Sequence, residues 1–367
     1  MKKITYVSFS ATPSTNPSSL QIVKTCEALS KLGHDVELII PNTGLDDKID
    51  FYYDIKNKFK IKKIKFIKTF PRGFNFYIYS ICCLLIIFFK MNNITITRSF
   101  FISFLLSLFF KKNILELHHD IGIEGRVSRF LVNKTNFLNN SNLFKIVAIS
   151  KSLKKLYSNN YKVNKRKIIV LPSGSSILTK LNLKIKKDSK RFNIGYFGSI
   201  SESKGIKTIL KLSKIDRYNN YYIYGGEKTN ISKLKIKCVN KNIYLHHHLS
   251  YSDVVEKINN MDLLIIPYTS NVKSAGEVDD ISEYTSPLKL FDYLACGKII
   301  ISSDLKVLRE VLSKKNCFFV KNYENIFNWK QVINRVKKLN EKQVIYKKIN
   351  FNYSKKFNHL ERVKKYL

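Results

Sequence analysis

The sequence has 367 residues, which is too long for one ordinary hydrophobic core and indicates two domains of about 150 to 200 residues each. Its high apolar and aromatic content excludes a disordered chain. A formal net charge of +38, from 65 Lys and Arg against 27 Asp and Glu, favours an anionic partner. A bias in composition can supply many of these lysines, and an anionic membrane surface is the most economical target for the remaining excess.

The cysteines and the N-terminus indicate a reduced, cytoplasmic protein. The six cysteines are scattered apart from the adjacent Cys82 and Cys83, and they lack metal-ligand spacing. The first residues, MKKITYVSFS, alternate like a buried strand and lack the features of a signal peptide. Two apolar runs, 74–90 and 99–112, are shorter than the ~18 to 20 apolar residues that span a bilayer. Each fits a buried helix or a helix that lies in a membrane interface.

Short apolar runs alternate with amphipathic stretches along the whole chain, which is the pattern of parallel sheets covered by helices. The first half begins with a strand near 3–9 and a helix over 18–31 that ends at Gly33. Further strands of this half are predicted at 35–40, 61–67, 94–97, 113–117, 144–149 and 167–171.

A lysine-rich polar stretch, TKLNLKIKKDSKR (179–191), marks the expected domain boundary. It predicts an N-terminal domain over 1–180 and a second domain over 190–340, with a C-terminal helix (341–367) packing back on the first domain. The second half repeats the alternation, with strands at 192–197, 220–224, 242–246, 262–266, 298–302 and 317–320, and helices from 204, at 229–238, 251–259 and 304–313, and from about 324. We expect two doubly wound domains that face each other across a cleft, with ligands beyond the carboxyl ends of the strands.

One of these strands ends in a polar cluster, in the stretch ILELHHD (114–120). His118 and His119 point to opposite faces if the chain stays extended, so one of them is expected to face the cleft. A histidine there can act as a general base, hold a hydroxyl group or cap the loop. A metal site is unsupported, because no third ligand with suitable spacing lies nearby.

Two glycine-containing loops follow strands of the second half. In GYFGSISESKGI (195–206), Gly198 allows a close backbone approach, and Lys204 adds a charge where a helix begins. This composition fits an anion site, and it equally fits a simple turn with a solvated lysine. In YIYGGE (222–227), Gly225 serves either a ligand or a tight turn.

The stretch SPLKLFDYLACGK (286–298) predicts a helix with Ser286 as N-cap and Pro287 in the first turn, ending at a glycine. Lys289 and Asp292 are three residues apart, so they can form a local ion pair. Alternatively, the helix N-terminus binds phosphate while Asp292 accepts hydrogen bonds from a sugar diol. The residues alone leave both interpretations open.

Metal binding is not expected elsewhere in the chain. The three histidines of LHHHLS (245–250) alternate faces and cannot all ligate one ion in ordinary geometry. No Asp-x-Asp triplet occurs in the sequence, which weakens any mechanism that places a divalent ion between carboxylates and a diphosphate. Lysines and helix dipoles are the alternative means of neutralising charge.

In their order and spacing, these motifs resemble the retaining nucleotide-sugar glycosyltransferases of family 4 (group 1), which have the GT-B fold of two Rossmann-like domains. The segments that carry the resemblance are ALSKLGHDVELIIP (28–41), ELHHD (116–120), VAISKSLKKL (147–156), VLPSGSS (170–176), IGYFGSISESKGI (194–206), MDLLIIPY (261–268) and SPLKLFDYLACGKIIISSD (286–304). They cover most of residues 145 to 310, and the ordered set is far more specific than any one segment.

The resemblance implies roles for particular residues. Lys204 would neutralise the donor diphosphate, Asp292 would bond the ribose hydroxyls, and Glu283 approximates an acidic residue near the donor sugar. His118 aligns best with the family's active-site histidine, with His119 as the fallback. The implied catalytic set is His118, Lys204 and Glu283, and the implied donor-binding set is Gly198, Ser199, Lys204, Gly225, Ser286, Pro287, Leu288, Lys289 and Asp292.

The sequence departs from the family pattern at several of these positions. The usual arginine after the loop glycine is Ser199, so Lys204 lacks its common partner. The paired glutamates become Asp292 and Tyr284, with Glu283 one place out of register. These changes indicate a subfamily, because loops of the SPLK type occur in glycosyltransferases of surface-polysaccharide pathways.

The sequence thus predicts a retaining, metal-independent glycosyltransferase that needs no cofactor. It would move a hexosyl or N-acetylhexosaminyl group from a nucleotide-sugar to a lipid-linked or growing surface glycan, such as capsule, O-antigen or exopolysaccharide. We expect it on the inner face of a bacterial plasma membrane. The alternatives are a sugar-nucleotide epimerase or hydrolase of the same fold, and a non-catalytic scaffold that binds membrane and partner proteins. Nucleic-acid binding is not expected, and it would show a steep salt dependence.

Overall fold

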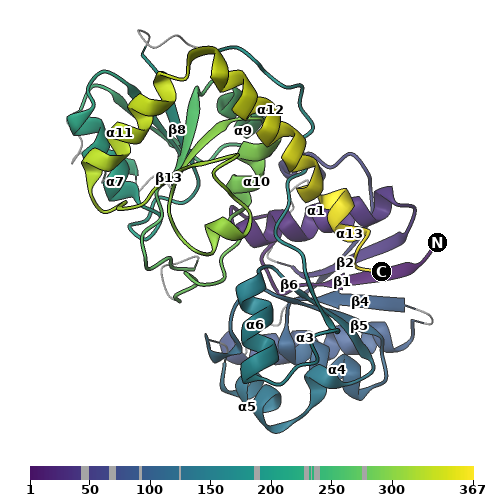
Figure 1. Cartoon of the computed structure of the whole chain (residues 1–367). Coiled ribbons are helices and arrows are strands. Elements are labelled where there is room, and N and C mark those ends of the chain that lie inside the picture. The colour runs from purple at the N-terminus through teal and green to yellow at the C-terminus, as the bar shows by residue number, and fades with distance from the viewer. Residues whose placement is uncertain are drawn as a thin grey trace. The chain divides into compact units, whose positions relative to one another are not determined.

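Two parallel β-sheets with helices on both faces form the framework of the protein (Figure 1). The structure is a computed structural model, and it describes residues 1–42, 49–65, 72–90, 93–123, 125–185, 191–226, 231–232, 234, 240–274 and 279–367. The chain divides into a first unit, Met1–Ser173 with His359–Leu367, and a second unit, Gly174–Asn358. Most of the predicted helix over 229–238 lies outside the described residues.

The sheet of the first unit has the strand order β3-β2-β1-β4-β5-β6-β7, and all of its neighbouring strands are parallel. These strands are β1 (Lys3–Val7), β2 (Asp35–Pro41), β3 (Lys60–Ile64), β4 (Asn93–Thr97), β5 (Asn113–Leu117), β6 (Leu143–Ala148) and β7 (Ile168–Val170). The strand order reverses between β1 and β4. In doubly wound sheets, ligands bind beyond the carboxyl ends of the strands at such a switch point.

Helices cover both faces of this sheet. They are α1 (Pro17–Lys31), α2 (Ile49–Tyr52), α3 (Arg72–Phe88), α4 (Phe100–Leu108), α5 (Arg126–Lys134), α6 (Lys151–Asn160) and α13 (His359–Val363), with 3-10 turns at Ile121–Ile123 and Phe137–Asn139. One core cluster joins α1 and α13 to β1 and β2, and another joins α3 and α4 to the opposite face of the same strands. The two apolar runs near 74–90 and 99–112 are therefore helices with one buried face.

The sheet of the second unit has the order β10-β9-β8-β11-β12-β13, again entirely parallel. Its elements are β8 (Asn193–Phe197), α7 (Ile206–Ile215), β9 (Asn220–Gly226), β10 (Ile243–His247), α9 (Tyr251–Asn259), β11 (Leu263–Ile266), α10 (Leu288–Ala295), β12 (Ile299–Ser303), β13 (Phe318–Val320), α11 (Ile326–Lys337) and α12 (Gln343–Ser354), with 3-10 turns at Leu308–Glu310, Asn340–Lys342 and Lys355–Phe357. Here the order reverses between β8 and β11. α7 and α11 pack on one face, and α9 and α10 pack on the other.

The C-terminal region and one connection differ from the sequence prediction. The helix predicted over 304–313 is wrong: only a 3-10 turn at Leu308–Glu310 forms, because bonds from Glu310 N to Val307 O and from Val311 N to Leu308 O interrupt the α-helical pattern. The predicted tail from about 324 contains two helices of the second unit, α11 and α12. Only the segment from His359 belongs to the first unit. The boundary between the two units also lies earlier than the predicted stretch 179–191, directly after Ser173.

Candidate functional site

Two glycines bring the ends of β8 and β9 together at the switch point of the second unit. Gly198 has a φ of 141° and donates its N–H to Tyr224 O at 2.8 Å. Gly225 has a φ of 120°, and a Cβ at this position would collide with the backbone of Gly198. Because L side chains rarely adopt these conformations, both positions need glycine. Among the predicted donor residues, Gly198 and Ser199 therefore follow β8, and Gly225 packs against Gly198 from the end of β9.

Lys204 lies at the start of α7, beside the end of β11. Its Nζ donates to Lys273 O at 2.5 Å and lies 5.1 Å from the ring centroid of Tyr268. The following Gly205 has a φ of 80°, and a Cβ there would collide with the carbonyl of Pro267. The glycine thus lets α7 begin directly against β11, which brings Lys204 to the switch point.

Lys289 extends from the first turn of α10 toward the same loop. Its Nζ lies 3.8 Å from the ring centroid of Tyr196 and 5.3 Å from that of Tyr268. A Cβ at Gly198 would collide with this ammonium group. Nζ is buried, and it has no hydrogen-bond partner among the residues that the structure describes. Burial, with a further contribution from the charge of Lys204, holds the pKa of Lys289 well below its usual range.

Asp292 does not form the local ion pair with Lys289 that its spacing allows, so that alternative interpretation is wrong. Its carboxyl group is buried and accepts a hydrogen bond of 2.6 Å from Ser175 Oγ. Ser175 belongs to the stretch VLPSGSS, which was part of the family resemblance. Burial raises the pKa of Asp292 to about 7, although the Ser175 hydrogen bond opposes this shift.

The residues before α10 are arranged differently from the prediction. The helix begins at Leu288, and Pro287, with φ −70° and ψ 126°, occupies the N-cap position expected for Ser286. Since Pro287 has no side-chain acceptor, it does not cap the first amides of the helix. Glu283 lies in the preceding turn and is exposed, whereas its neighbour Tyr284 is buried and donates to Asp280 O at 3.0 Å.

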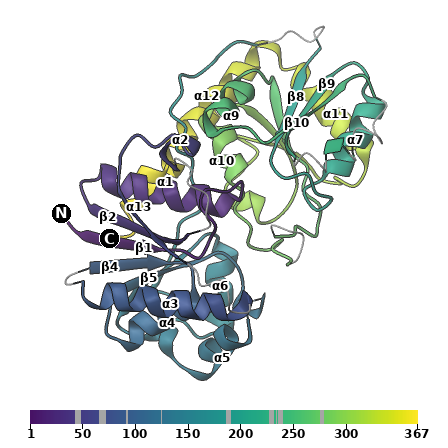
Figure 2. The same ribbon diagram turned by 180° about the vertical axis from the view of Figure 1, so that it is seen from behind.

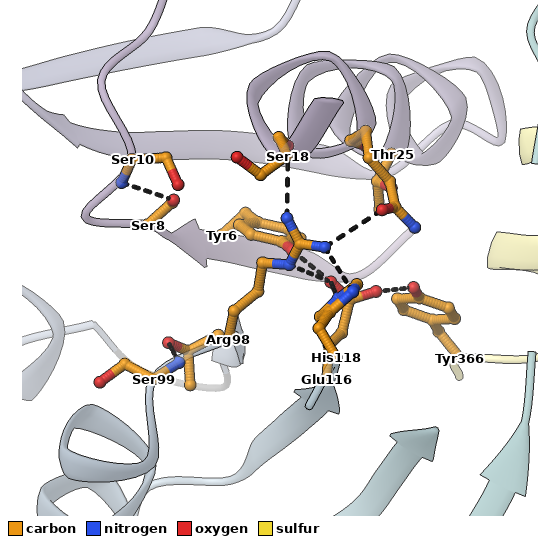
Figure 3. Close-up of polar contacts among 12 residues, drawn as sticks. Tyr6, Ser8, Ser10, Ser18, Thr25, Arg98, Ser99, Glu116, His118 and Tyr366 are labelled. Carbon is orange, nitrogen blue, oxygen red and sulfur yellow. Dashed lines mark hydrogen bonds and ion pairs between the residues drawn. The ribbon is translucent and has the colours of Figure 1, made fainter. Parts of the chain in front are cut away.

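In the first unit, His118 follows β5 and contacts Arg98, which follows β4 (Figure 3). Arg98 Nη2 lies 2.7 Å from His118 Nδ1. A guanidinium can only donate, so Nδ1 must accept, and the proton of the neutral ring lies on Nε2. Burial, followed by the charge of Arg98, lowers the pKa of His118 to about 3. His118 is therefore neutral at pH 7, and this geometry leaves it no lone pair with which to act as a base.

Arg98 and His118 belong to a cluster around the buried Glu116. Tyr6 and Tyr366 donate to the Glu116 carboxylate, and Arg362 Nη2 donates to Oε1 at 3.0 Å. Arg98 Nε and His118 Nε2 each lie 3.7 Å from Oε2. Burial raises the pKa of Glu116, but Arg362, His118 and Arg98 together hold it well below its usual range.

The fallback His119 and the adjacent Asp120 point to other partners. The His119 backbone oxygen accepts from Tyr157 at 3.2 Å, and its ring packs edge-on against Phe100. Asp120 accepts from Tyr161 at 2.6 Å. His118 lies 3.7 Å from the Glu116 carboxylate and therefore belongs to the cluster around Glu116.

Arg98, Arg362 and Tyr366 were not among the predicted site residues. Arg98 directly follows a predicted strand, so the rule that functional residues follow strands could have found it. Arg362 and Tyr366 gave no such signal, because they lie in the basic tail, about 250 positions from Glu116 in the sequence.

Within the described ranges, no group of three or more His, Cys, Asp or Glu residues is arranged to hold a metal ion. Among the described helices, none is both long and apolar enough to cross a membrane.

The comparisons with known proteins agree on the fold. Residues 179–352 match the family model of glycosyl transferases group 1. Among curated proteins, no sequence matches this chain. Among solved structures, HepE from Anabaena in complex with UDP and glucose aligns over 100% of this chain and 98% of its own, with a TM-score of 0.69 at 10% identity.

Two other solved structures are similar over nearly their whole length. Sucrose-phosphate synthase from Thermosynechococcus elongatus has a TM-score of 0.72 at 12% identity, covering 100% of this chain and 97% of its own. The lipopolysaccharide outer core galactosyltransferase WaaB has a TM-score of 0.66 at 14% identity, covering 99% of this chain and 98% of its own. The predicted GT-B class with two parallel α/β units is confirmed. Residues 179–352 thus resemble the group 1 glycosyl transferases, and the similarity to these solved structures shows the fold of the whole chain.

Proposed function

We propose that this protein is a retaining, metal-independent glycosyltransferase that needs no cofactor. It moves a hexosyl or N-acetylhexosaminyl group from a nucleotide-diphosphate sugar to a lipid-linked or growing surface glycan. The observation that carries the proposal is the buried Lys289 ammonium, which has no hydrogen-bond partner among the described residues and lies at the strand ends with Lys204. A buried amine with a lowered pKa and no described hydrogen-bond partner at a switch point fits an anionic ligand, which would favour its charged form.

The donor diphosphate is the group that this site would stabilise. When the sugar leaves, negative charge develops on the diphosphate, and preorganised cations and amides lower the barrier for that step. Lys204 and Lys289 supply the two charges, and Lys289 takes the place of the cation that Ser199 cannot provide. The first amides of α10, from Leu288, add hydrogen-bond donors at the positive end of the helix dipole.

Asp292 and Glu283 would act on the sugar parts of the donor. Asp292 would exchange its Ser175 hydrogen bond for the ribose hydroxyls, and the exposed Glu283 would contact the donor sugar from the turn before α10. In the first unit, His118 would orient a sugar hydroxyl and would not remove a proton, because Arg98 occupies Nδ1 and the ring is neutral. A reaction that retains the configuration of the donor sugar is compatible with a His118 that does not act as a base.

The acceptor is proposed to be held at an anionic membrane surface. The C-terminal ends of α3 and α4 lie together, since Lys111 Nζ donates to Phe88 O at 2.6 Å and the rings of Phe88 and Phe109 are in contact. Phe89 and Phe110 at these ends are 80% and 83% exposed. Exposed aromatic rings next to lysines suit the interface of an anionic bilayer on the cytoplasmic side.

The donor proposal is tested by titrating the purified protein with UDP, GDP and ADP and with their sugar conjugates, following thermal stability and heat of binding. UDP-glucose is the first donor to test, because the similar HepE structure holds UDP and glucose. We expect one nucleotide to bind, and Lys204→Ala to abolish binding. Lys207→Ala is the matched control, because Lys207 lies on α7 and pairs with Glu202 in solvent. If no nucleotide binds the wild-type protein, the proposal is wrong.

The acceptor proposal is tested separately by sedimentation with vesicles of phosphatidylglycerol or phosphatidylcholine. We expect binding to phosphatidylglycerol only, and its loss in a Phe89→Ser, Phe110→Ser double variant that still binds nucleotide. Equal binding by this variant would contradict the role of these rings. Turnover of donor at the same rate with and without acceptor lipid would favour a hydrolase or epimerase over a transferase.

A further inference from the structure

The segment His359–Leu367 is an integral part of the first unit. Helix α13 contacts α1, and the two lie side by side in both views (Figures 1 and 2). Arg362, Val363 and Tyr366 are almost completely buried. Arginine is rarely buried unless it is paired, so this segment must meet specific partners inside the unit.

These partners are Glu116 and Pro172, which lies near the end of the stretch Met1–Ser173. Arg362 Nε donates to Pro172 O at 3.0 Å, and its Nη2 donates to Glu116 Oε1 at 3.0 Å. Tyr366 donates to the same oxygen (Figure 3). Arg362 Nη1 in turn donates to the Tyr366 hydroxyl. One oxygen of the Glu116 carboxylate is therefore held by the C-terminal segment.

The other oxygen faces the candidate active-site histidine. Tyr6 donates to Oε2, while Arg98 Nε and His118 Nε2 lie 3.7 Å away from it. Arg98 also donates to Ser18 O at 3.3 Å and to Gln21 Oε1 at 3.1 Å, which fixes its guanidinium plane against α1. Its remaining contact, at 2.7 Å, is the one that sets the tautomer of His118.

We propose that the C-terminal segment is a positioning element for His118, in which Arg362 and Tyr366 hold Glu116 and Glu116 holds Arg98 against the imidazole. Its importance for catalysis rests on the proposed function, in which His118 orients a sugar hydroxyl. Arg362, Tyr366 and Glu116 are positioning residues, because they would act through Arg98 and His118.

A purely structural role explains this cluster less well. Apolar side chains of similar volume often stabilise a core as well as, or better than, a buried ion pair does. A cluster in which two guanidinium groups face one carboxylate also keeps one excess positive charge, since His118 is neutral. What such a cluster does supply is a fixed hydrogen-bond geometry around the imidazole.

The test compares Tyr366→Phe with Lys364→Ala in the full-length protein. Tyr366→Phe removes only the hydroxyl that contacts Glu116, and Lys364→Ala changes an exposed residue of the same segment that pairs with Glu361. The ¹⁵N resonances of labelled histidine report the tautomer of His118 directly, and a His118→Asn variant assigns them. Glu116→Gln, which keeps the side-chain shape, is the second variant in case Tyr366→Phe does not fold.

In the wild type and in Lys364→Ala, we expect an unprotonated Nδ1 and a protonated Nε2 from pH 8 down to about pH 5, consistent with the low pKa of His118. In Tyr366→Phe or Glu116→Gln, we expect the two tautomers to exchange and the pKa to move toward its ordinary value. The kcat for transfer should fall by about 10- to 100-fold, because small misplacements of a positioned group have effects of that size. The KM for the donor and the affinity for UDP should stay unchanged, since the donor residues belong to Gly174–Asn358.

If the folded variants keep the wild-type histidine resonances, the positioning role is wrong even if they unfold more easily. A parallel loss of UDP affinity in these variants would also overturn it, because it would indicate general damage to the protein. If the wild-type protein transfers no sugar from any donor, the proposed function fails, while the tautomer comparison still decides the positioning role.

Discussion

Glu116 in the first unit and Asp292 in the second are both buried carboxyl groups, but their surroundings differ. Glu116, 1% exposed, faces two arginines and accepts from two tyrosines, and its pKa lies well below the usual range. Asp292, 9% exposed, has one described hydrogen bond, from Ser175, and its pKa is raised to about 7. The first carboxylate is held ionised, and the second can be neutral under physiological conditions.

The buried cations of the two units show the same contrast. Arg362 binds a carboxylate and a backbone carbonyl, whereas the Lys289 ammonium meets only aromatic rings and a glycine loop among the described residues. Buried charges that lack partners are costly and cluster at functional sites. The comparison indicates that the first unit pairs its buried carboxylate internally, while the second unit would pair its buried amine with the proposed donor.

Breaking the internally paired cluster should have the largest effect on stability. Arg362→Met leaves Glu116 with one arginine, and we expect a loss of about 3 to 5 kcal/mol in the free energy of unfolding of the first unit. The only tryptophan of the chain, Trp329, is buried in α11 of the second unit. Urea unfolding followed by circular dichroism should therefore split, with an early transition that Trp329 fluorescence does not report. A single unshifted transition would contradict the comparison.

The unpaired carboxyl group should give a pH-dependent effect of similar or smaller size. Because the folded-state pKa of Asp292 is raised to about 7 from an unfolded value of 3.8, its stabilising contribution is complete below about pH 4 and is lost as the pH rises toward 7. The difference of about three units corresponds to about 4 kcal/mol. Asp292→Asn should thus unfold at a higher urea concentration than the wild type at pH 8, and at nearly the same concentration at pH 4.

Trp329 fluorescence is the measurement for Asp292→Asn, because both residues belong to the second unit. The same variant should bind nucleotide more weakly if Asp292 holds the ribose. A variant that is destabilised at pH 8 would show that Asp292 is ionised and paired in the folded protein, which would remove the contrast with Glu116.

These contrasts could be predicted from the sequence only in part. Strand positions and strand ends follow from the alternation of apolar runs, which is why Gly198, Lys204 and His118 were predicted to lie at the edges where ligands bind in such sheets. The spacing of Lys289 and Asp292 allowed a local ion pair as one of two interpretations, but Lys289 contacts Tyr196 and Tyr268 while Asp292 contacts Ser175. The contact of Arg362 with Glu116 joins residues about 250 positions apart, and no local pattern encodes such a contact.

Removing the Lys289 side-chain amine should change stability in the opposite direction to removing Arg362. Lys289→Met deletes a buried ammonium that has no described hydrogen-bond partner, so we expect the second unit to be stabilised by about 1 to 3 kcal/mol. The affinity for the donor nucleotide should nevertheless fall at least about tenfold, which corresponds to about 1.4 kcal/mol. Thermal unfolding and calorimetric titration on the same sample separate the two effects. A variant that loses stability while keeping its affinity would reverse the assignment.

The smallest effect is expected from a charged residue that is exposed and lies outside the proposed donor site. Lys207 pairs with Glu202 at 2.6 Å, but the two side chains are 65% and 71% exposed, and such pairs contribute about 0 to 1 kcal/mol. Lys207→Ala should therefore change the nucleotide affinity by less than about twofold. Nucleotide binding by this variant should also depend less on the salt concentration than the total charge of the chain suggests. Calorimetric titration at two salt concentrations measures both. If Lys207→Ala weakened binding as much as Lys204→Ala, the diffuse charge of the chain, and not the placement of Lys204 and Lys289, would explain anion binding.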